Sequence, residues 1–131
     1  MNLAIIGSTG LVGKKMLEIL EERNFPIEKI IPVASKKSEG SSIEFNGVRY
    51  RVISIENSLN EKIDIALFSA GSEVSLEWAP KFSNKGICVI DNSSAWRMND
   101  GVKLIIPEIN GSLLESKDRI IANPNCSTIQ M

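Results

Sequence analysis

The sequence of 131 residues contains no histidine, and this absence restricts its chemistry more than any other feature of the composition. No Ser/His or Cys/His catalytic pair can form within the chain, so a general base must be a carboxylate, a lysine or a group from other polypeptide. Only two cysteines are present, Cys88 and Cys126, which are too few for a disulfide framework. We therefore predict no metal site and expect both thiols to stay reduced.

The sequence also lacks an excess of charge of one sign. It contains 15 Lys and Arg residues and 16 Asp and Glu residues, for a net charge of −1. Because the signs are interspersed, no basic face indicates nucleic acid or an anionic membrane. The apolar run at 63–70 is interrupted by Asp64 and is far shorter than the ~20 residues that span a bilayer. With no signal-like N-terminus, we expect a cytoplasmic protein that binds neither nucleic acid nor membranes.

Aromatic residues are scarce, at 5% of the sequence, and two of them are tryptophans. Trp78 shares a helical apolar stripe with Val74 and Phe82, in a segment that Pro80 is expected to kink or shorten. Trp96 lies in a polar loop. We interpret both tryptophans as packing residues.

What the sequence does contain is a regular alternation of short apolar runs with segments of helical periodicity. The apolar runs are typical of strands and occupy residues 3–6, 30–34, 63–70, 87–91, 104–107 and 119–122. Helical spacing follows the first run through Val12, Met16, Ile19 and Leu20, and a helical turn is expected at 111–114. This alternation, without internal repeats, predicts a doubly wound α/β fold of Rossmann-like type, with a mostly parallel sheet and helices on both faces.

Two local signals refine this arrangement. Pro32 lies in the second strand and cannot donate a backbone hydrogen bond there, which favours an edge position or an irregularity. Asn46-Gly47 separates two alternating segments, 43–45 and 48–52, and predicts a two-residue hairpin at the periphery of the domain.

Three glycines, Gly7, Gly10 and Gly13, lie between the first strand and the first helix. A tight turn at this point directs backbone N–H groups and the positive end of the helix dipole at a phosphate. The spacing differs from Gly-x-Gly-x-x-Gly because Ser8 and Thr9 separate the first two glycines. The strand before the turn and the helix after it favour dinucleotide binding over a tight turn without a ligand.

The residues after the second strand bear on which dinucleotide would bind. NAD-selective domains place an acidic residue near the end of that strand, where it holds the ribose 2′-hydroxyl. Here Lys36 and Lys37 stand between Ser35 and Ser38, and Glu28 precedes the strand. Cationic and hydroxyl groups suit a 2′-phosphate, so the segment favours NADP over the alternative of a solvated lysine pair.

Cys126 is the candidate nucleophile. It follows Pro124 and Asn125 just after the last strand, where a helix is expected to begin, and the pKa of a thiol falls at a helix N-terminus. Side chains and N–H groups around the cysteine can cap that helix and hold an oxyanion. Cys88 lies inside an apolar strand and is interpreted as a small core residue. The residues alone leave open a buried, unreactive thiol at Cys126.

Six segments, in this order, resemble the aspartate-semialdehyde dehydrogenases of bacterial type. They are Gly7-Ser8-Thr9-Gly10-Leu11-Val12-Gly13, Ala34-Ser35-Lys36-Lys37-Ser38-Glu39-Gly40, Phe68-Ser69-Ala70-Gly71, Asp91-Asn92-Ser93-Ser94-Ala95-Trp96-Arg97, Ile106-Pro107-Glu108-Ile109-Asn110 and Asn123-Pro124-Asn125-Cys126-Ser127-Thr128. The resemblance covers essentially the whole chain. It implies a reversible, NADPH-dependent conversion of L-aspartyl phosphate to L-aspartate semialdehyde and phosphate, which feeds lysine, diaminopimelate, threonine and methionine synthesis.

The resemblance also implies roles for individual residues. Cys126 would attack the acyl carbon and form a thioester that NADPH reduces. Arg97 would bind the substrate phosphate, although a solvent-facing arginine is the alternative. Asn92 and Asn125 are candidates for the same site, where they contact an oxyanion or the cofactor amide, or only cap turns. The implied cofactor contacts are Gly7, Thr9, Gly10, Leu11 and Val12 at the diphosphate, Lys37 and Ser38 at the 2′-phosphate, and Ser69, Ala70 and Gly71 near the ribose and nicotinamide.

Members of this family continue into a second domain that carries an acid/base histidine, substrate-orienting residues and most of the dimer interface. We therefore expect residues 1–131 to form the NAD(P)-binding domain, with the nucleophile on 123–131, the second α+β domain missing and little turnover from these residues alone. The full-length enzyme is expected to be a homodimer or homotetramer acting on a small molecule. The alternatives are an N-acetyl-glutamyl-phosphate reductase, disfavoured by Asn125 and Ser127, and a non-catalytic NADP-binding or redox-sensing module.

Overall fold

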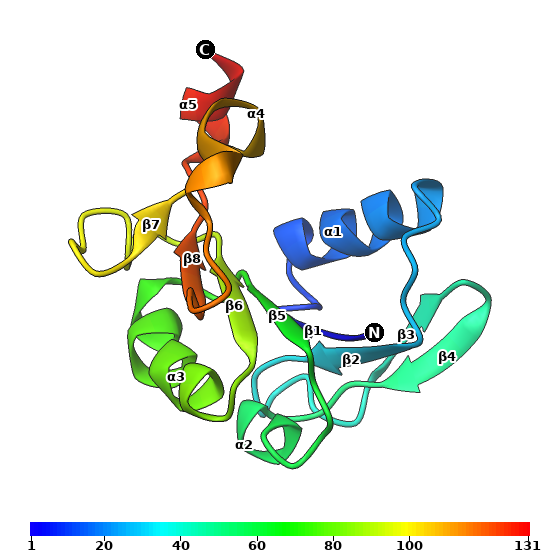
Figure 1. The fold of residues 1–131 in the computed structure, drawn as a ribbon. Helices are drawn as coiled ribbons and strands as arrows, with labels where there is room; N and C mark the ends of the chain where they lie inside the picture. Colours follow the sequence, from blue (N-terminus) through cyan, green and yellow to red (C-terminus); the bar gives the residue numbers. More distant parts are fainter.

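A six-stranded, all-parallel sheet forms the centre of the computed structural model, which describes residues 1–131 (Figure 1). The strands lie in the order β2-β1-β5-β6-β8-β7. Their bounds are Asn2–Ile6 for β1, Lys29–Val33 for β2, Ile65–Phe68 for β5, Cys88–Asp91 for β6, Lys103–Leu104 for β7 and Ile120–Ala122 for β8. The chain runs outward from β1 to β2 and returns to pair β5 with the other side of β1, which makes the β1–β5 boundary a topological switch point. The predicted doubly wound fold is confirmed.

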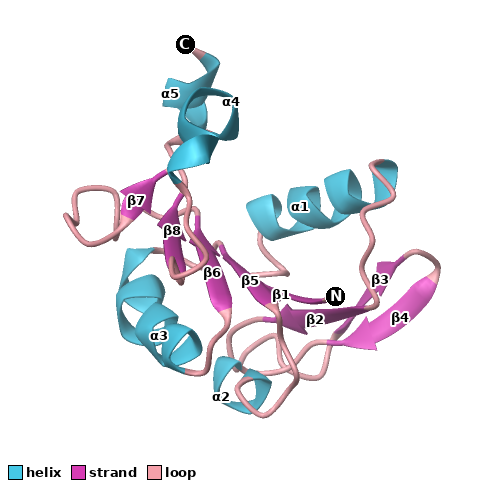
Figure 2. Cartoon of the chain, in the orientation of Figure 1, coloured by secondary structure: helices cyan, strands magenta, loops and turns pink.

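One face of the sheet is covered by α1 (Leu11–Glu22) (Figure 2). Gly13 and Leu17 are the buried residues of this helix, and Leu17 packs in a cluster with apolar side chains of β1, β2 and the hairpin. The predicted apolar stripe was therefore partly wrong: Val12 is 44% exposed and Ile19 is 38% exposed. The close approach of Gly13 to the preceding turn sets the helix rotation, so the inward face passes through residues 13 and 17 instead.

The other face is covered by α3 (Ser72–Asn84), with the short α2 (Ile55–Ser58) beside it (Figure 1). The larger core cluster lies here, where the rings of Phe68 and Phe82 meet edge to face with centroids 5.3 Å apart. Pro80 lies inside α3 but does not end it, because the helix continues to Asn84. Trp96 packs against this cluster, as interpreted from the sequence.

The hairpin consists of β3 (Ser42–Phe45) and β4 (Val48–Arg51), which pair antiparallel beside β2. Asn46 and Gly47 both have positive φ angles, of 50° and 73°, as a type I′ turn requires. Phe45 is buried against the α1 cluster, so the hairpin contributes to the core. Strand β2, with Pro32, lies at the edge of the main sheet, which confirms the position predicted for it.

The C-terminal elements are α4 (Pro107–Asn110), the 3₁₀ turn η1 (Gly111–Leu113) and α5 (Cys126–Gln130), and the two short helices stand beyond the end of the sheet (Figure 2). The strand predicted at 104–107 is present as β7 but is shorter, because it ends at Leu104 and Pro107 begins α4. Proline is favoured at the first helical position. Asn110 stabilises the turn by accepting from the N–H of Ile106 (2.7 Å) and donating to the carbonyl of Leu104 (2.9 Å).

Part of the sheet has no covering helix. On the α1 side, Ile65 and Leu67 of β5 pack against the α1 cluster. Their same-face neighbours Cys88, Ile90 and Ile121 belong to neither core cluster and are half-buried.

None of the helices combines the length and the apolar character that crossing a membrane requires.

Candidate functional site

The turn between β1 and α1 depends on glycine at two points. Gly7 has φ of +94°, and a Cβ there would lie 2.5 Å from the carbonyl oxygen of Ser69. The N–H groups of Gly7 and Ser8 both donate to the carbonyl of Val33, at 2.9 and 3.0 Å, so the turn is held against the end of β2. Gly10 is the N-cap of α1 and has no side chain, which leaves the first-turn N–H groups of the helix open to an anion.

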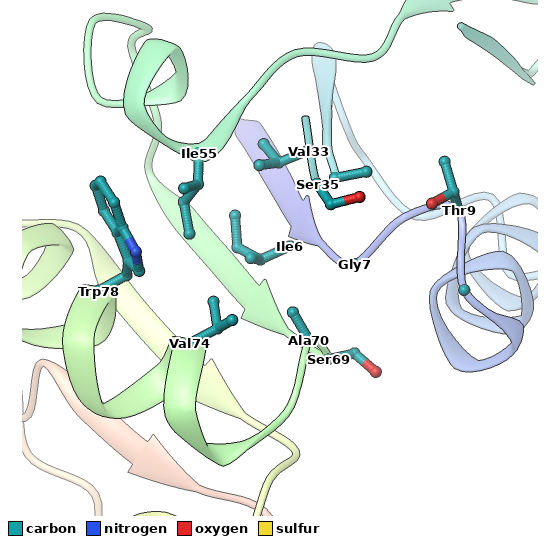
Figure 3. A pocket seen from close by; sticks show the side chains of 12 residues that line it. Ile6, Gly7, Thr9, Val33, Ser35, Ile55, Ser69, Ala70, Val74 and Trp78 are labelled. Atoms are coloured by element: carbon teal, nitrogen blue, oxygen red, sulfur yellow. The ribbon is translucent and has the colours of Figure 1, made fainter. Parts of the chain in front are cut away.

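A pocket of about 450 Å³ opens at the carboxyl ends of β1, β2 and β5, at the switch point of the sheet (Figure 3). Five of the predicted cofactor residues line it: Gly7, Thr9, Gly10, Ser69 and Ala70. The other five predicted residues, Leu11, Val12, Lys37, Ser38 and Gly71, are not among its lining. Leu11 is 88% exposed, so the part of this residue available to a ligand at the turn is its backbone N–H, one of the first-turn donors of α1.

The far end of this pocket is apolar and was not found from the sequence. Ile55, Val74 and Trp78 project into it from α2 and α3, opposite the glycine turn (Figure 3). Trp78 packs against the larger core cluster, as interpreted from the sequence, and its half-buried side chain also forms a wall of the pocket. The ammonium group of Lys81 lies 3.8 Å from the centre of its ring, which orders the indole. The helical spacing of Val74 and Trp78 was visible in the sequence, but it does not indicate which part of this apolar helix face would line a pocket.

The segment after β2 forms a compact turn. The N–H groups of Ser38 and Glu39 donate to the carbonyl of Ser35, which itself lines the pocket. The Lys37 side chain is exposed, and Ser38 is half-buried. The carboxylate of Glu39 accepts from the Asn57 side chain (3.0 Å) at α2, so the acidic group of this segment is already engaged. Glu28 lies at the amino end of β2, away from the pocket, and its carboxylate is 3.6 Å from the N-terminal amine.

Cys126 is the first residue of α5 and its side chain is exposed. Asn125 caps this helix, because its side-chain oxygen accepts from the N–H groups of Ser127 (2.9 Å) and Thr128 (3.2 Å). The predicted helix start is therefore confirmed, and the thiol is not buried. Cys88 is the opposite case: it is half-buried in β6, and burial raises the pKa of its thiol, an effect that the positive charge of Arg119 opposes.

Arg97 is not a free surface arginine. Its Nε–H donates to the carbonyl of Asn123 (2.9 Å) and its Nη2–H donates to the carbonyl of Asn92 (3.0 Å). The side-chain amide of Asn123 donates to that of Asn92 (2.8 Å). The loop that follows β6 and the segment that follows β8 are thus joined, which brings Arg97 and Asn92 to the segment that carries Cys126. Asn123 is the residue of this group to which the sequence assigned no role.

The loop that carries Arg97 has further contacts at its base. Asp91 is fully buried at the end of β6, and one carboxylate oxygen accepts from the hydroxyl of Ser93 (2.6 Å), which in turn accepts from the N–H of Ala95 (3.1 Å). The indole N–H of Trp96 donates to the hydroxyl of Ser75 in α3 (2.9 Å). These bonds fix the loop between β6 and α3.

Comparison with known proteins places this geometry in a family. A profile of the family described as "Semialdehyde dehydrogenase, NAD binding domain" matches residues 2–117. The chain belongs to this family. The aspartate-semialdehyde dehydrogenase of Aquifex aeolicus is 54% identical over 98% of the chain, and that of Bacillus subtilis is 44% identical over all of it. A crystal structure of aspartate semialdehyde dehydrogenase II from Vibrio cholerae, complexed with ASA, superposes with a TM-score of 0.92 at 47% identity over 99% of the chain.

These comparisons confirm the resemblance to aspartate-semialdehyde dehydrogenases that the six sequence segments indicated. The family profile ends at residue 117, before Cys126, but the alignment with the Bacillus subtilis protein covers the cysteine segment as well. The chain spans about two fifths of the length of these relatives, 39% and 38% of the two sequences and 43% of the Vibrio cholerae chain. The semialdehyde dehydrogenase NAD-binding domain is therefore the part that this chain represents.

Proposed function

We propose that this chain is the NADP-binding and nucleophile-bearing part of an enzyme that reduces L-aspartyl 4-phosphate to L-aspartate 4-semialdehyde. The observation that carries the proposal is the junction of the β6 and β8 loops, where the Arg97 guanidinium is bonded to the segment that contains the exposed Cys126. A nucleophilic thiol on a segment bonded to a cation that can bind phosphate suits an acyl phosphate. The relatives are named for aspartate semialdehyde, which is the product of the proposed reduction.

The pocket fits a dinucleotide in its shape and in its donors. The absence of side chains at Gly7 and Gly13 lets the turn pack closely against Ser69 and the end of β1, and the open first-turn N–H groups of α1 suit a diphosphate. The apolar end lined by Ile55 and Trp78 suits an adenine ring. Lys37, exposed on the turn after β2, would pair with a 2′-phosphate, with Ser38 beside it. NADPH, when bound, supplies a hydride.

In the direction of semialdehyde formation, the Cys126 thiolate attacks the acyl carbon of the substrate. A sulfur–carbon bond forms and the carbon–oxygen bond to phosphate breaks, so phosphate leaves with the bonding electrons and Arg97 neutralises its charge. Hydride addition to the resulting thioester then releases the aldehyde and restores the thiolate. Asn125 caps the start of α5 and holds Cys126 at the first residue of that helix in both steps. Because the chain has no histidine, we propose that the acid/base group comes from other polypeptide.

We also propose that the enzyme works as a homo-oligomer in the cytoplasm. The exposure of large apolar side chains supports a homo-oligomer. Met98, Ile109 and Leu113 are 94%, 78% and 57% exposed in this chain. Exposed apolar groups of this size favour burial against other polypeptide.

The proposal is tested by assaying the full-length gene product for NADP-dependent oxidation of L-aspartate semialdehyde in the presence of phosphate. The Cys126→Ala variant should lose turnover by several orders of magnitude, whereas Cys88→Ala should retain it. Activity that survives in Cys126→Ala would contradict the proposal. Activity on the N-acetyl-glutamyl substrate instead would favour the alternative reductase, and cofactor binding without either activity would favour the redox-sensing module.

A further inference from the structure

The Arg97 guanidinium has a defined orientation that follows from which of its N–H groups are used. A guanidinium carries five N–H donors. The Nε–H and one Nη2–H point at the carbonyls of Asn123 and Asn92, so one edge of the group is bonded to the protein. Three donors remain, and two of them, one on Nη1 and one on Nη2, form an edge with the geometry that binds a phosphate through two parallel hydrogen bonds.

The two carbonyls that accept hydrogen bonds from Arg97 follow different strands. The distance between these carbonyls therefore determines the orientation of the free edge of the guanidinium. Asn92 follows β6, where its N–H donates to the carbonyl of Phe68 (2.9 Å). Asn123 follows β8, where its N–H donates to the carbonyl of Asp91 (2.8 Å). Beyond these strand-end bonds, the side-chain amide of Asn123 donates to the Asn92 side chain at 2.8 Å. Both asparagines are partly buried, which shields this bond from water.

We propose that Asn123 is a positioning residue for Arg97. Its side-chain amide fixes the separation of the two carbonyls, and the carbonyls hold the guanidinium in one orientation against Asn123, three residues before Cys126. A mobile arginine would have to lose side-chain entropy each time it bound phosphate, and the preformed arrangement removes that cost from binding. This inference rests on the proposed role of Arg97 in phosphate binding.

The first test observes the arginine directly and does not depend on activity. In the full-length gene product labelled with ¹⁵N-arginine, the Nε–H of Arg97 should exchange slowly with solvent because it donates to Asn123. Asn123→Ala removes the amide but keeps both carbonyls, and should accelerate this exchange about tenfold. Asn123→Ser, whose side chain is too short to reach Asn92, should do the same. Asn110→Ala is the matched control, because the Asn110 side chain also makes hydrogen bonds within the protein but lies at α4.

The second test is a double-mutant cycle on the KM for phosphate in the oxidative direction. Asn123→Ala should raise this KM about tenfold with little change in kcat, and Arg97→Ala should raise it at least as much. If Asn123 acts through Arg97, adding Asn123→Ala to Arg97→Ala should change the KM no further. If the two substitutions have multiplying effects on the KM, the inference is overturned. It is also overturned if the Arg97 Nε–H exchanges as slowly in both Asn123 variants as in the parent protein. If Arg97→Ala alone leaves the KM unchanged while exchange still accelerates in the Asn123 variants, the phosphate role of Arg97 fails and the positioning of Arg97 by Asn123 stands.

Discussion

The backbone of Gly13, in the first turn of α1, lies directly against the carbonyl group of Gly7. A Cβ atom on Gly13 would overlap the carbonyl oxygen of Gly7 and lie 2.8 Å from the Cα atom of Ser8. The neighbours are backbone atoms, which cannot rotate away as a side chain can. The helix can therefore approach the end of β1 only with glycine at this position, and this approach sets the distance between the helix N-terminus and the pocket.

Gly13→Ala should destabilise the domain in spite of the higher helix propensity of alanine. Overpacking at a rigid contact typically costs about 1–3 kcal/mol, which exceeds the ~1 kcal/mol that alanine gains over glycine in a helix. Chemical denaturation of the two proteins measures the difference. Gly111→Ala is the control, because a Cβ there would come no closer than 4.0 Å to another atom, at Pro107. Equal stability of Gly13→Ala and the parent would contradict the contact.

The two thiols should differ in reactivity. Cys126 is exposed at the start of α5, whereas burial raises the pKa of Cys88 and reduces its thiolate fraction at neutral pH. Iodoacetamide should therefore label Cys126 first, and the labelling rate of Cys88 should keep rising into the alkaline range. The pKa of Cys88 is higher in the folded state than in the unfolded state. The contribution of Cys88 to folding stability is therefore complete below the unfolded pKa and is lost as the pH rises through the folded pKa. Peptide mapping after timed labelling distinguishes the sites, and faster labelling of Cys88 would contradict this assignment.

Trp78 and Lys37 should affect cofactor binding in different ways. If Trp78 contacts the adenine, Trp78→Ala should weaken NADPH and NADH binding alike, by about tenfold. If Lys37 binds the 2′-phosphate, Lys37→Ala should weaken NADPH binding and leave NADH binding unchanged. Titration calorimetry with both cofactors measures this, and each variant serves as the control for the other. A Lys37→Ala protein with an unaltered preference for NADPH would remove the argument for the 2′-phosphate site.

The ion pairs around Lys103 should make stability depend on pH. Lys103 contacts Asp118 and Glu115, each at 2.8 Å, which raises the pKa of the lysine and lowers the pKa of both carboxyls. The carboxyl contribution is present above the unfolded pKa values and is lost as the pH falls through the lower, folded values. The lysine contribution is complete below its unfolded pKa and is lost as the pH rises through its higher, folded value.

Asp118→Asn should therefore lower Tm at neutral pH, and the difference from the parent should disappear as the pH falls below the folded pKa of Asp118. The Asp118 side chain is only 15% exposed and also accepts from the N–H of Glu115 (2.8 Å). Glu77→Gln is the matched control, because its pair with Lys81 lies on an exposed helix surface and such pairs contribute little. A Tm difference that persists unchanged in acid would show that the charge of Asp118 is not involved.

Short-range signals in the sequence predicted most of the fold, and the errors have physical causes. The hairpin turn was predicted correctly, because Asn46 and Gly47 both tolerate the positive φ that the turn requires. The apolar run that ends at Ile6 was also correctly interpreted as a strand. The rotation of α1 depends on the tertiary contact of Gly13, so Val12 and Ile19 of the predicted stripe are exposed, whereas Met16 and Leu20 pack against the core. The strand predicted at 104–107 was too long, because Asn110 stabilises a helical turn that begins at Pro107.

The candidate site was predicted where a motif is local and missed where distant strands create it. The glycine turn and the helix start at Cys126 are each contained in a few consecutive residues. The wall formed by Trp78 depends on α2 lying opposite α3, and the bond from Asn123 to Asn92 spans 31 positions of the chain. A single sequence contains no signal for either relationship.

The most direct test of the account is to look for the acyl group on Cys126. The full-length gene product is mixed with L-aspartate semialdehyde and NADP⁺ without phosphate, quenched in acid, digested and analysed by mass spectrometry. The account predicts an aspartyl thioester on the peptide that contains Cys126, formed together with NADPH and removed by added phosphate. NADPH formation with Cys126 unmodified, or an acyl group on Cys88 instead, would contradict it.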